Sequence, residues 1–422
     1  MRLGLEAPRR LLAELGDPQS QFATVLVAGT NGKGSTAAWL AAMAVAAGYR
    51  TGLYTSPHLE ELTERVRIDG RAVPGDDLGG WLLEVGAAAE AALGGLPTYF
   101  ELITAAAFRG FAARGVDLAV VEVGMGGRLD ATNVTEPALC IITEIGLDHE
   151  RHLGGSVAEI AGEKAGILRP GRPAIAGCGH PEAMAAVRRV ASGVGAELVV
   201  AAKAASWRPL GEPAMGLEVT TDLATHRLRP RLAGAHQAHN LALAVLAAER
   251  LRQLGWPAID DVAIADGAGR CRWPGRLESV DLAGLAGRPD LEVLLDVAHN
   301  PAAAVQLAAH LTRLGRPYDL LFGTLTDKRG ERILPPLAAP ARRVVLSRPA
   351  GARGRPPREL LPFVPGGEAI VEPRLGPALD RALEGTAPLL VICGSFYLVG
   401  EARRKLSERF GTPRPAAAIA TC

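Results

Sequence analysis

The feature that most constrains this chain is an apolar run that leads directly into a glycine-rich turn and then into a helix. The run is Val25–Ala28, the turn is Gly29–Gly34, and a helix-forming stretch begins at Ser35. Such a turn points several backbone N–H groups at one place, and the helix N-terminus adds a partial positive charge there. Lys33 adds a full positive charge. The segment therefore predicts a phosphate-binding loop at the end of a buried strand.

The amino-acid sequence of this loop differs from the general P-loop pattern, in which Lys is followed directly by Ser or Thr. Here the loop is shorter, and Gly34 separates Lys33 from the hydroxyl residues Ser35 and Thr36. Either hydroxyl can contact Mg²⁺. A plain glycine-rich turn with a helix cap is the alternative. The flanking strand and helix favour phosphate binding, as does a lysine retained in a lysine-poor chain.

Asparagine and lysine are scarce, so each one is informative. The chain of 422 residues has four Asn, and only five of its 46 basic residues are Lys. A net charge of +1 gives no reason to expect a nucleic-acid or membrane partner. No apolar run is long enough to span a membrane. Five scattered Cys without a CxxC pair indicate a reducing, cytoplasmic setting without a zinc site. We also expect a monomer.

Strand-like and helix-like stretches alternate along most of the chain, and this predicts a P-loop-type doubly wound, mostly parallel α/β sheet. Near 205–232, short alternating segments indicate a small antiparallel patch. The alternation restarts at Leu291 and predicts a second, smaller Rossmann-like α/β domain. The expected boundaries are 1–278 for the first domain, 279–411 for the second, a loop at Gly284–Pro289, and a disordered tail at 412–422.

Possible metal ligands follow the ends of three predicted strands. They are Ser56 within Thr55–Leu59, Glu122 at the end of Leu118–Val123, and the pair Asp148-His149. The carboxyl ends of parallel strands converge on one edge, where such groups can hold Mg²⁺ against phosphate oxygens. Ser56 can also be a plain turn residue, and His149 can be part of a surface pair. Glu122 is harder to dismiss, because an unpaired carboxylate in an apolar strand is costly.

The sequence Gly-Thr-Asn-Gly-Lys-Gly-Ser at 29–35 resembles the phosphate loop of the folylpolyglutamate synthase/dihydrofolate synthase family within the Mur ligase superfamily. Peptidoglycan Mur ligases usually have Lys followed directly by Thr or Ser, so the extra Gly34 resembles the folate branch. The resemblance extends from about Leu3 to about Glu408. Family members usually carry another helix before that stretch, and this chain lacks it.

The resemblance implies an ATP-dependent ligase that joins L-glutamate to a folate-type carboxylate through an acyl phosphate. The acceptors would be dihydropteroate, giving dihydrofolate, and tetrahydrofolate, which gains further glutamates. Residues Arg128–Asn133 resemble the version found in bifunctional members, and this favours both activities.

The resemblance also assigns residues to ATP and to two Mg²⁺ ions. The ATP-binding residues would be Gly29, Thr30, Asn31, Gly32, Lys33, Gly34, Ser35, Thr36, Asn240, Arg276, Asp296 and His299. Ser56 and Glu122 would ligate one Mg²⁺ and His149 the second. Lys164 matches a family lysine that is carbamylated, and its carbamate would ligate or orient the second Mg²⁺. Lys33, Lys164 and His149 are thus the expected catalytic residues.

Several of these residues have simpler interpretations when the sequence is considered alone. Lys164 can be a helix-surface amine paired with Glu159 or Glu163. Asn240 is placed in the first turn of a helix predicted over 239–254 and can simply cap it. Arg276 can be a solvated arginine. Two further features are Lys328, in a loop that resembles the family's Asp-Lys loop, and Gly394–Phe396, which is expected to cap the last helix.

A pterin site follows from the resemblance as well. Its residues would be Leu3, Gly4, Leu5, Thr98, Tyr99, Phe100, Glu101, Leu129, Asp130 and Ala131. The rings of Tyr99 and Phe100 can stack on a flat heteroaromatic ring, although such residues more often belong to the core.

Two other functions remain open from the sequence. One is another Mur-type amino-acid ligase, such as a peptidoglycan-precursor ligase. The other is a P-loop ATPase or nucleotide switch that hydrolyses ATP without ligation. The metal ligands and the two-domain layout argue against the switch.

Overall fold

The computed structural model describes residues 4–211, 216–282, 291–411 and 414–415 of the chain. These residues form two compact units, Met1–Arg231 with Gln237–Cys271, and Leu232–His236 with Arg272–Cys422. Leu3, the predicted loop at 284–289 and most of the predicted tail lie outside the described residues. In the described part, none of the helices has the length and apolar character needed to cross a membrane.

The first unit is built on an eight-stranded sheet in the order β4-β3-β2-β5-β1-β6-β7-β8. The strands from β2 to β8 are parallel, and β3 pairs antiparallel with both β2 and β4. Strands β5 and β6 are buried along their whole length, as expected for a parallel sheet covered on both faces. The bounds are β1 (Ala23–Ala28), β2 (Thr51–Tyr54), β3 (Val66–Ile68), β4 (Arg71–Ala72), β5 (Leu118–Glu122), β6 (Leu139–Ile142), β7 (Pro173–Ala176) and β8 (Glu197–Val200).

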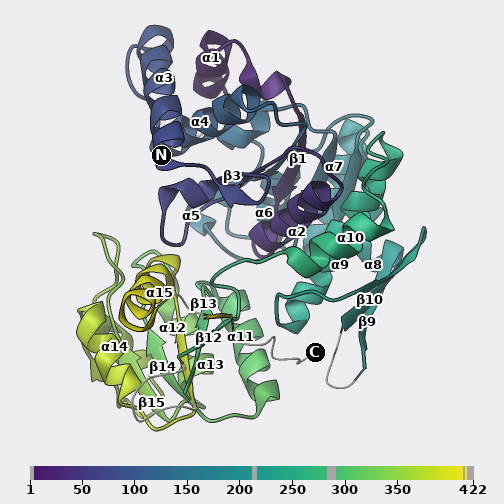
Figure 1. The fold of residues 1–422 in the computed structure, drawn as a ribbon. Helices are drawn as coiled ribbons and strands as arrows, with labels where there is room; N and C mark the ends of the chain where they lie inside the picture. The colour runs from purple at the N-terminus through teal and green to yellow at the C-terminus, as the bar shows by residue number, and fades with distance from the viewer. Residues whose placement is uncertain (1–3, 212–215, 283–290, 412–413, 416–422) are drawn as a thin grey trace. The chain divides into compact units, whose positions relative to one another are not determined.

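Helices pack around this sheet (Figure 1). They are α1 (Glu6–Glu14), α2 (Lys33–Ala46), α3 (Gly75–Leu93), α4 (Tyr99–Ala113), α5 (Glu150–Leu153), α6 (Val157–Ala165), α7 (Pro181–Val194), α8 (Ala201–Ala204), α9 (Ala235–Gln253) and α10 (Asp261–Arg270). Short 3₁₀ turns lie at η1 (Pro18–Ser20), η2 (Leu62–Arg65) and η3 (Ala131–Val134). One hydrophobic core extends from Leu11 to Ala191 through the sheet.

A small antiparallel sheet confirms the patch predicted near 205–232. Its strands, in the order β11-β10-β9, are β9 (Ala205–Leu210), β10 (Gly216–Thr221) and β11 (Thr225–Leu228). A buried pair fastens this sheet to helix α9, because His226 Nε2 lies 2.9 Å from Glu249 Oε1. The hydroxyl of Thr221 donates to the same Glu249 oxygen. Side-chain chemistry, rather than further strands, therefore holds the small sheet in place.

The second unit contains a seven-stranded sheet in the order β16-β15-β14-β17-β13-β12-β18. The strands from β16 to β13 are parallel, and β12 is antiparallel to both of its neighbours. The strand bounds are β12 (Glu278–Asp281), β13 (Glu292–Asp296), β14 (Tyr318–Phe322), β15 (Arg343–Leu346), β16 (Ile370–Val371), β17 (Leu389–Cys393) and β18 (Arg414–Pro415). The helices are α11 (Pro301–Leu314), α12 (Gly330–Ile333), α13 (Pro335–Ala338), α14 (Leu375–Leu383) and α15 (Phe396–Phe410), with a 3₁₀ segment η4 (Pro357–Phe363).

The helices of the second unit flank its sheet (Figure 1). A doubly wound, mostly parallel first unit and a smaller Rossmann-like second unit confirm the predicted fold class. One detail differs from the prediction. Within the tail expected to be disordered, Arg414–Pro415 forms strand β18 and pairs with β12. Strand β18 is therefore the edge strand of the sheet, next to β12.

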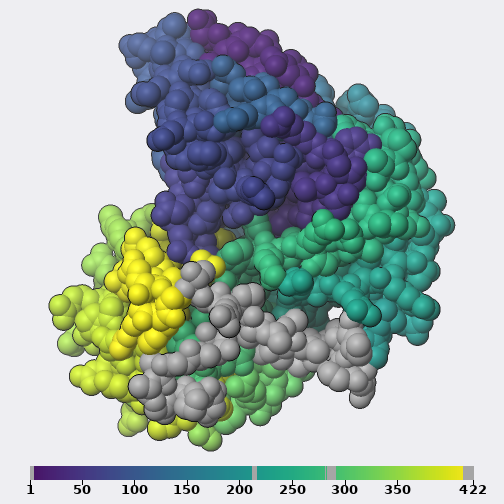
Figure 2. All heavy atoms as spheres, in the orientation of Figure 1, coloured from purple at the N-terminus to yellow at the C-terminus, as the bar shows by residue number. Residues whose placement is uncertain are grey.

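Helix α2 is buried on nearly all sides, because it is packed between the parallel sheet and helix α10. The two helices approach closely where Gly267 of α10 meets Met43 of α2. A Cβ atom on Gly267 would lie 2.4 Å from Met43 Cα, which is backbone and cannot rotate away. In the space-filling view, purple atoms from α2 lie beside teal-green atoms from α9 and α10 (Figure 2). The helix that follows the glycine-rich turn is thus wedged in place.

We predict that Gly267→Ala destabilises the first unit by about 1–3 kcal/mol, because the new methyl group must push α10 away from α2. Gly269→Ala on the same helix is the matched control, since its Cβ would meet only Arg229 O at 3.7 Å. There the intrinsic preference of Ala for helix should leave stability equal or slightly raised. Urea unfolding followed by circular dichroism measures both. Equal midpoints for the two variants would contradict the tight α2–α10 contact.

Candidate active site

The glycine-rich turn is held by the strand end beside it. The backbone N–H of Thr30 donates to Glu144 O at 2.8 Å, and that of Asn31 donates to the same oxygen at 3.2 Å. The hydroxyl of Thr143 donates to Asn31 O at 2.8 Å. Thr143 and Glu144 directly follow β6, which pairs with β1. The turn is therefore anchored to the neighbouring strand, and its shape is fixed before any ligand arrives.

Two glycines of the turn cannot be replaced without a clash. Gly29 has φ +153°, and a Cβ there would lie 1.9 Å from the Thr143 hydroxyl oxygen. Gly32 has φ +88°, precedes helix α2, and would place a Cβ 2.3 Å from Asn240 Oδ1. Only glycine fits both the backbone conformation and the space. The amide of Asn240 thus lies against the turn.

The prediction for Asn240 was wrong in one respect and informative in another. Helix α9 begins at Ala235, directly after Gly234 with φ +100°, so Asn240 lies in the second turn and caps nothing. Its Nδ2 donates to Gln237 Oε1 at 3.1 Å, and its backbone oxygen accepts from the Thr36 hydroxyl at 3.4 Å. The helix starts early because the glycine, not a polar cap, ends the preceding segment. The structure brings Asn240 to the phosphate loop.

Lys33 faces a carboxylate across the turn. Its Nζ lies 3.9 Å from Glu122 Oε1 and donates to Thr30 O at 3.2 Å. The other oxygen of Glu122 accepts the backbone N–H of Ser56 at 3.1 Å. Glu122 is only 6% exposed at the end of β5. Three of the predicted site residues, from three segments of the chain, therefore meet at the carboxyl edge of the sheet.

Lys164 is buried rather than on the helix surface. It is 5% exposed, and its Nζ donates to Gly29 O at 2.8 Å. The interpretation as a surface ion pair is wrong, because Glu163 pairs with Arg128 and Glu159 closes a capping box with Ser156. Burial lowers the pKa of Lys164 to about 7, and the positive charge of Lys33 acts in the same direction. A substantial fraction of this amine is therefore uncharged near neutral pH.

His149 lies farther out. Its side chain is 40% exposed, and its Nε2 lies 3.9 Å from Asp148 Oδ2. Asp148 is the more buried partner, and its charge favours the protonated form of Lys164. Among the described residues, no preformed group of three His, Cys, Asp or Glu side chains could hold a metal. Mg²⁺ commonly uses only one or two protein ligands together with phosphate oxygens.

The residues assigned to the pterin site divide into exposed rings and structural anchors. The Tyr99 ring is 58% exposed, whereas Phe100 packs partly against the core. Glu101 accepts from the backbone N–H and the hydroxyl of Thr98, which closes a capping box at the start of α4. Its carboxylate is therefore engaged in holding the helix. Of the two aromatic residues, Tyr99 therefore has the more exposed ring.

The loop that contains Leu129, Asp130 and Ala131 is tied down by buried polar groups. Asp130 is 5% exposed and accepts from the backbone N–H groups of Met125 and Thr132 and from the Thr132 hydroxyl. Burial raises the pKa of Asp130, and these hydrogen bonds oppose the shift. The described pterin residues also include Gly4 and Leu5 at the start of α1.

Asn133 proved to be an anchor for this loop. Its Nδ2 donates to the carbonyl oxygens of Arg128 and Gly166, and its Oδ1 accepts from Arg169 at 2.9 Å. Arg169 also donates to Thr135 O. Sequence reasoning missed Arg169, and nothing in the local pattern marks it among 41 arginines. The network joins the loop to the segment that follows α6, the helix that carries Lys164.

In the second unit, Arg276 and His299 both lie near the ring of Phe396, the last residue of the segment expected to cap the final helix. The guanidinium of Arg276 is 5.0 Å from the centroid of the Phe396 ring, and the His299 ring is 5.3 Å from the same ring. Asp296 is buried and accepts the backbone N–H groups of Leu277 and Ala298. Burial raises the pKa of Asp296, and the charge of Arg276 opposes this. The three assigned residues gather where β13 ends.

Three other polar features of the second unit are capping or loop groups. Asn300 caps α11 by accepting from Ala303 N, and Ser395 caps α15 by accepting from Leu398 N. The cap predicted at Gly394–Phe396 is therefore confirmed. Lys328 lies in a loop where its carbonyl oxygen accepts from Arg355.

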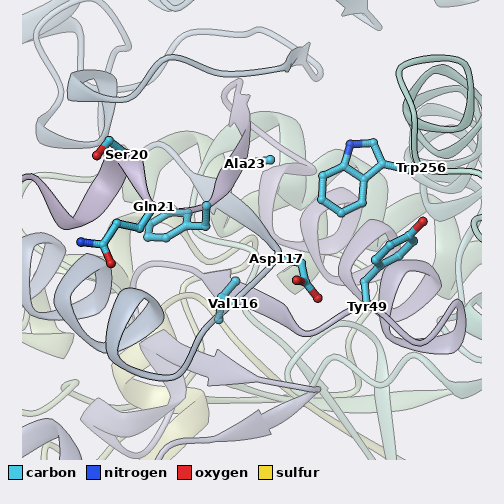
Figure 3. Close-up of a pocket in the computed structure, with 8 residues that line it drawn as sticks. Ser20, Gln21, Ala23, Tyr49, Val116, Asp117 and Trp256 are labelled. Atoms are coloured by element: carbon cyan, nitrogen blue, oxygen red, sulfur yellow. The ribbon is translucent and has the colours of Figure 1, made fainter.

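A hollow of about 700 Å³ lies elsewhere on the first unit (Figure 3). Tyr49 and Trp256 lie on one side of it and Ser20 and Gln21 on the other, with Asp117 between them (Figure 3). It opens where β1 and β5 begin, at the edge opposite to the glycine-rich turn. None of the predicted site residues lines it.

Comparison with known proteins defines the class of this fold and site. Residues 27–248 match the family model described as the Mur ligase middle domain. This match covers the glycine-rich turn, Glu122, Lys164 and Asn240, and it includes most of the first unit, so the chain contains a Mur ligase middle domain.

Similarity over nearly the whole chain identifies the family. The chain is 32% identical over 416 residues to the Bacillus subtilis dihydrofolate synthase/folylpolyglutamate synthase, covering 96% of this chain and 95% of that protein. It is 38% identical over 424 residues to a probable bifunctional folylpolyglutamate synthase/dihydropteroate synthase of Haloferax volcanii, covering 95% of this chain. The chain spans about half, 48%, of that longer protein. It belongs to the folylpolyglutamate synthase/dihydrofolate synthase family.

Solved structures agree with this assignment. Escherichia coli FolC in complex with DHPP and ADP has a TM-score of 0.84 and 32% identity, covering 97% of this chain and 94% of that chain. A bifunctional folylpolyglutamate synthase/dihydrofolate synthase with Mn, AMPPNP and L-glutamate bound has a TM-score of 0.83 and 31% identity, covering 96% and 95%. At these identities the likeness extends to both the fold and the family.

We predict that the stability of the second unit falls in acid through His236. Burial lowers the pKa of His236 to about 4, and the positive charge of Arg276 adds to this effect. A histidine with a lowered pKa is neutral in the fold, so its contribution is present above pH 6.5 and is lost as pH falls toward 4. The loss should reach up to about 3 kcal/mol. Urea unfolding at several pH values should show a smaller acid loss in His236→Gln, and an unchanged loss would contradict the assignment.

Proposed function

We propose that this protein uses ATP to join L-glutamate to the carboxylate of a folate-type acceptor through an acyl phosphate. The acceptors we propose are dihydropteroate and tetrahydrofolate. The observation that carries the proposal is the meeting of Lys33, Glu122 and Lys164 at one anchored glycine-rich turn. Family membership supplies the substrate class, because the relatives' names and complexes include folate ligands, adenine nucleotides and glutamate.

The phosphate loop supports binding of the nucleotide phosphates. Helix α2 begins at Lys33, so its N-terminal dipole and the lysine charge add at the same point. Lys33 now faces Glu122, and phosphate oxygens would compete for its ammonium group. Charge that develops on the transferring phosphoryl group would be stabilised by this lysine and by the backbone N–H groups of the turn. Gly29, Thr30, Asn31, Gly32, Gly34, Ser35, Thr36 and Asn240 complete the proposed phosphate-binding set.

Two residues at the strand ends support the proposal of a Mg²⁺ site. Glu122 has a buried carboxylate at the end of β5, and the backbone N–H of Ser56 donates to it, so Ser56 and Glu122 are neighbours. Hard oxygen donors of this kind suit Mg²⁺. We propose Ser56 and Glu122 for one ion and His149 with modified Lys164 for a second. A bound Mg²⁺ would supply charge neutralisation for the phosphate oxygens.

Lys164 suits carbamylation for three physical reasons. It is buried, its amine contacts Gly29 O instead of an acidic partner, and its pKa is lowered to about 7. Only the uncharged amine adds CO₂, so a buried amine beside another cation is predisposed to this reaction. The carbamate is an anion, and it would replace the unfavourable approach of two positive charges by a favourable pair with Lys33.

In the second unit, we propose that Arg276, Asp296 and His299 bind the nucleotide. The flat apolar ring of Phe396 is near both the Arg276 guanidinium and the His299 imidazole. Asp296 is held by two backbone N–H groups, which fixes its orientation. We propose the pterin site at Leu3, Gly4, Leu5, Thr98, Tyr99, Phe100, Glu101, Leu129, Asp130 and Ala131, with the exposed Tyr99 ring as the contact surface.

The reaction is tested by ATP-dependent incorporation of labelled glutamate with dihydropteroate and, separately, with tetrahydrofolate. We expect product with each acceptor, and phosphate release that depends on both acceptor and glutamate. Product only with a UDP-linked peptidoglycan precursor would identify a different Mur-type ligase. Phosphate release without any acceptor would indicate an ATPase or switch instead.

Lys33→Ala should reduce ligation by at least about a thousandfold, since the transferring phosphoryl group loses its cation. Lys203→Ala, which removes an exposed lysine of the same unit, is the matched control and should ligate like the wild type. The readout is labelled glutamate in product, with thermal unfolding to show that both variants are folded. A Lys33→Ala variant that ligates at the wild-type rate would remove the phosphate-loop assignment.

Carbamylation of Lys164 is tested directly by ¹³C NMR after incubation with labelled bicarbonate. We expect a carbamate signal that grows as pH rises through about 7, because the neutral amine fraction increases in that range. The signal should be absent in Lys164→Ala and present in Lys203→Ala. Short carboxylic acids should partly restore ligation in Lys164→Ala, since a free carboxylate can take the place of the carbamate. A wild-type protein without the signal would rule out the modification.

A further inference from the structure

Arg65 is a positive charge that the first unit buries without a negative partner. It is the last residue of η2 and is 7% exposed. Its Nε donates to His58 Nδ1 at 2.9 Å, and its guanidinium carbon lies 5.5 Å from the centroid of the Tyr99 ring. Neither contact supplies a full negative charge. Among the residues that the structure describes, no Asp or Glu oxygen lies within 4.0 Å of its nitrogens.

The neighbouring carboxylate is committed elsewhere. Glu64 accepts the backbone N–H groups of Leu59, Glu60 and Glu61, each at 2.9 Å. These bonds hold the loop before η2 and occupy the carboxylate oxygens of Glu64. Although Glu64 is next to Arg65 in sequence, its carboxylate therefore serves the loop backbone and does not pair with the guanidinium.

An uncompensated buried guanidinium is costly to maintain, because burial removes its hydration. Arginine has five N–H donors in a planar fork that matches a carboxylate. The Nε donor is taken by His58, so the donors left for a ligand are those of the two terminal nitrogens. The hydrogen bond to His58 and the cation–π contact with the Tyr99 ring both restrict the guanidinium. Such a preoriented fork is suited to a planar anion.

The location of Arg65 indicates which anion would bind to its guanidinium. The backbone N–H of Thr55 donates to Arg65 O at 3.0 Å, which places Arg65 beside the end of β2 and close to Ser56. The charges of Arg65 and Glu122 also act on the pKa of the buried Tyr54 hydroxyl, which Arg65 lowers and Glu122 raises, although burial has the largest effect and raises it. Arg65 thus joins the exposed Tyr99 ring to the edge of the sheet that carries the phosphate loop.

We propose that Arg65 binds the carboxylate of the folate-type substrate, the group that is joined to glutamate, with the Tyr99 ring beside the aromatic part of that substrate. This rests on the proposed function and names a residue that orients the acceptor rather than one that takes part in proton or phosphoryl transfer. His58 holds Nε and leaves the terminal nitrogens for the ligand. In dihydropteroate the carboxylate is the benzoate group, and in tetrahydrofolate it belongs to glutamate.

Binding, measured by calorimetry without nucleotide, tests the proposal. The probes are pteroate and the same molecule with a carboxamide in place of the carboxylate. We expect the wild type to prefer the carboxylate by about tenfold or more, because a charged hydrogen-bonded pair replaces a neutral contact. Arg65→Met should bind both probes equally, and Arg65→Lys should fall between them because it lacks the fork.

Two further variants separate recognition from folding. Arg71→Met, at an exposed arginine on β4, is the matched control and should keep the preference for the carboxylate. Tyr99→Leu should weaken binding of both probes alike and keep the preference, because the guanidinium remains. A purely structural Arg65 would lower thermal stability without changing the ratio between the probes.

The outcomes for this proposal and for the ligase function are distinct. If the wild type ligates glutamate but binds both probes equally, or if Arg65→Met retains the preference, the role of Arg65 is wrong and the ligase function stands. If the wild type binds neither probe and ligates no folate-type acceptor, the proposed function fails first, and the role of Arg65 fails with it.

Discussion

The arrangement of this site depends on one contact, the attachment of the glycine-rich turn to the end of strand β6. Thr30 and Asn31 donate their backbone N–H groups to Glu144 O, and the Thr143 hydroxyl fills the space that a side chain at Gly29 would need. Because β1 pairs with both β5 and β6, this attachment also sets the turn beside Glu122. Lys33 and Lys164 then reach the same turn from two helices. A change in the register of β6 would displace all of these groups together.

Charge balance explains why the turn is poised for an anion. Two amines, Lys33 and Lys164, approach it, while Glu122 is the carboxylate that directly faces Lys33. Burial and the neighbouring lysine push Lys164 toward its neutral form, which relieves part of the repulsion. Phosphate oxygens or a carbamate would relieve more. Lys33 and the N-terminus of α2 therefore present positive potential to a phosphate group at this turn.

The sequence was sufficient where function depends on the chain order of strand, turn and helix. Glu122 and Lys33 could be placed because they directly border predicted elements, and the strand predicted at Leu118–Val123 is found as β5 (Leu118–Glu122). Contacts between distant segments could not be foreseen. The start of α9 at Ala235 depends on Gly234 and on packing, and the burial of Lys164 depends on Gly29, which is far away in sequence. The roles assigned to individual site residues, and the predicted domain boundaries, stay predictions.

Two anionic reactants that repel each other must be brought together in the reaction we propose, and the chain provides a separate kind of cation for each. Lys33 is a compact ammonium at a helix N-terminus, which suits the several oxygens of a phosphate group. Arg65 is a planar fork fixed by His58 and Tyr99, which suits the two oxygens of a carboxylate. Lys33 follows β1 through the glycine-rich turn, and Arg65 contacts Thr55, directly after β2; in the sheet, β5 lies between β1 and β2. Rigid strands thus hold the two cations at a fixed separation, and this lowers the entropic cost of aligning the reacting groups.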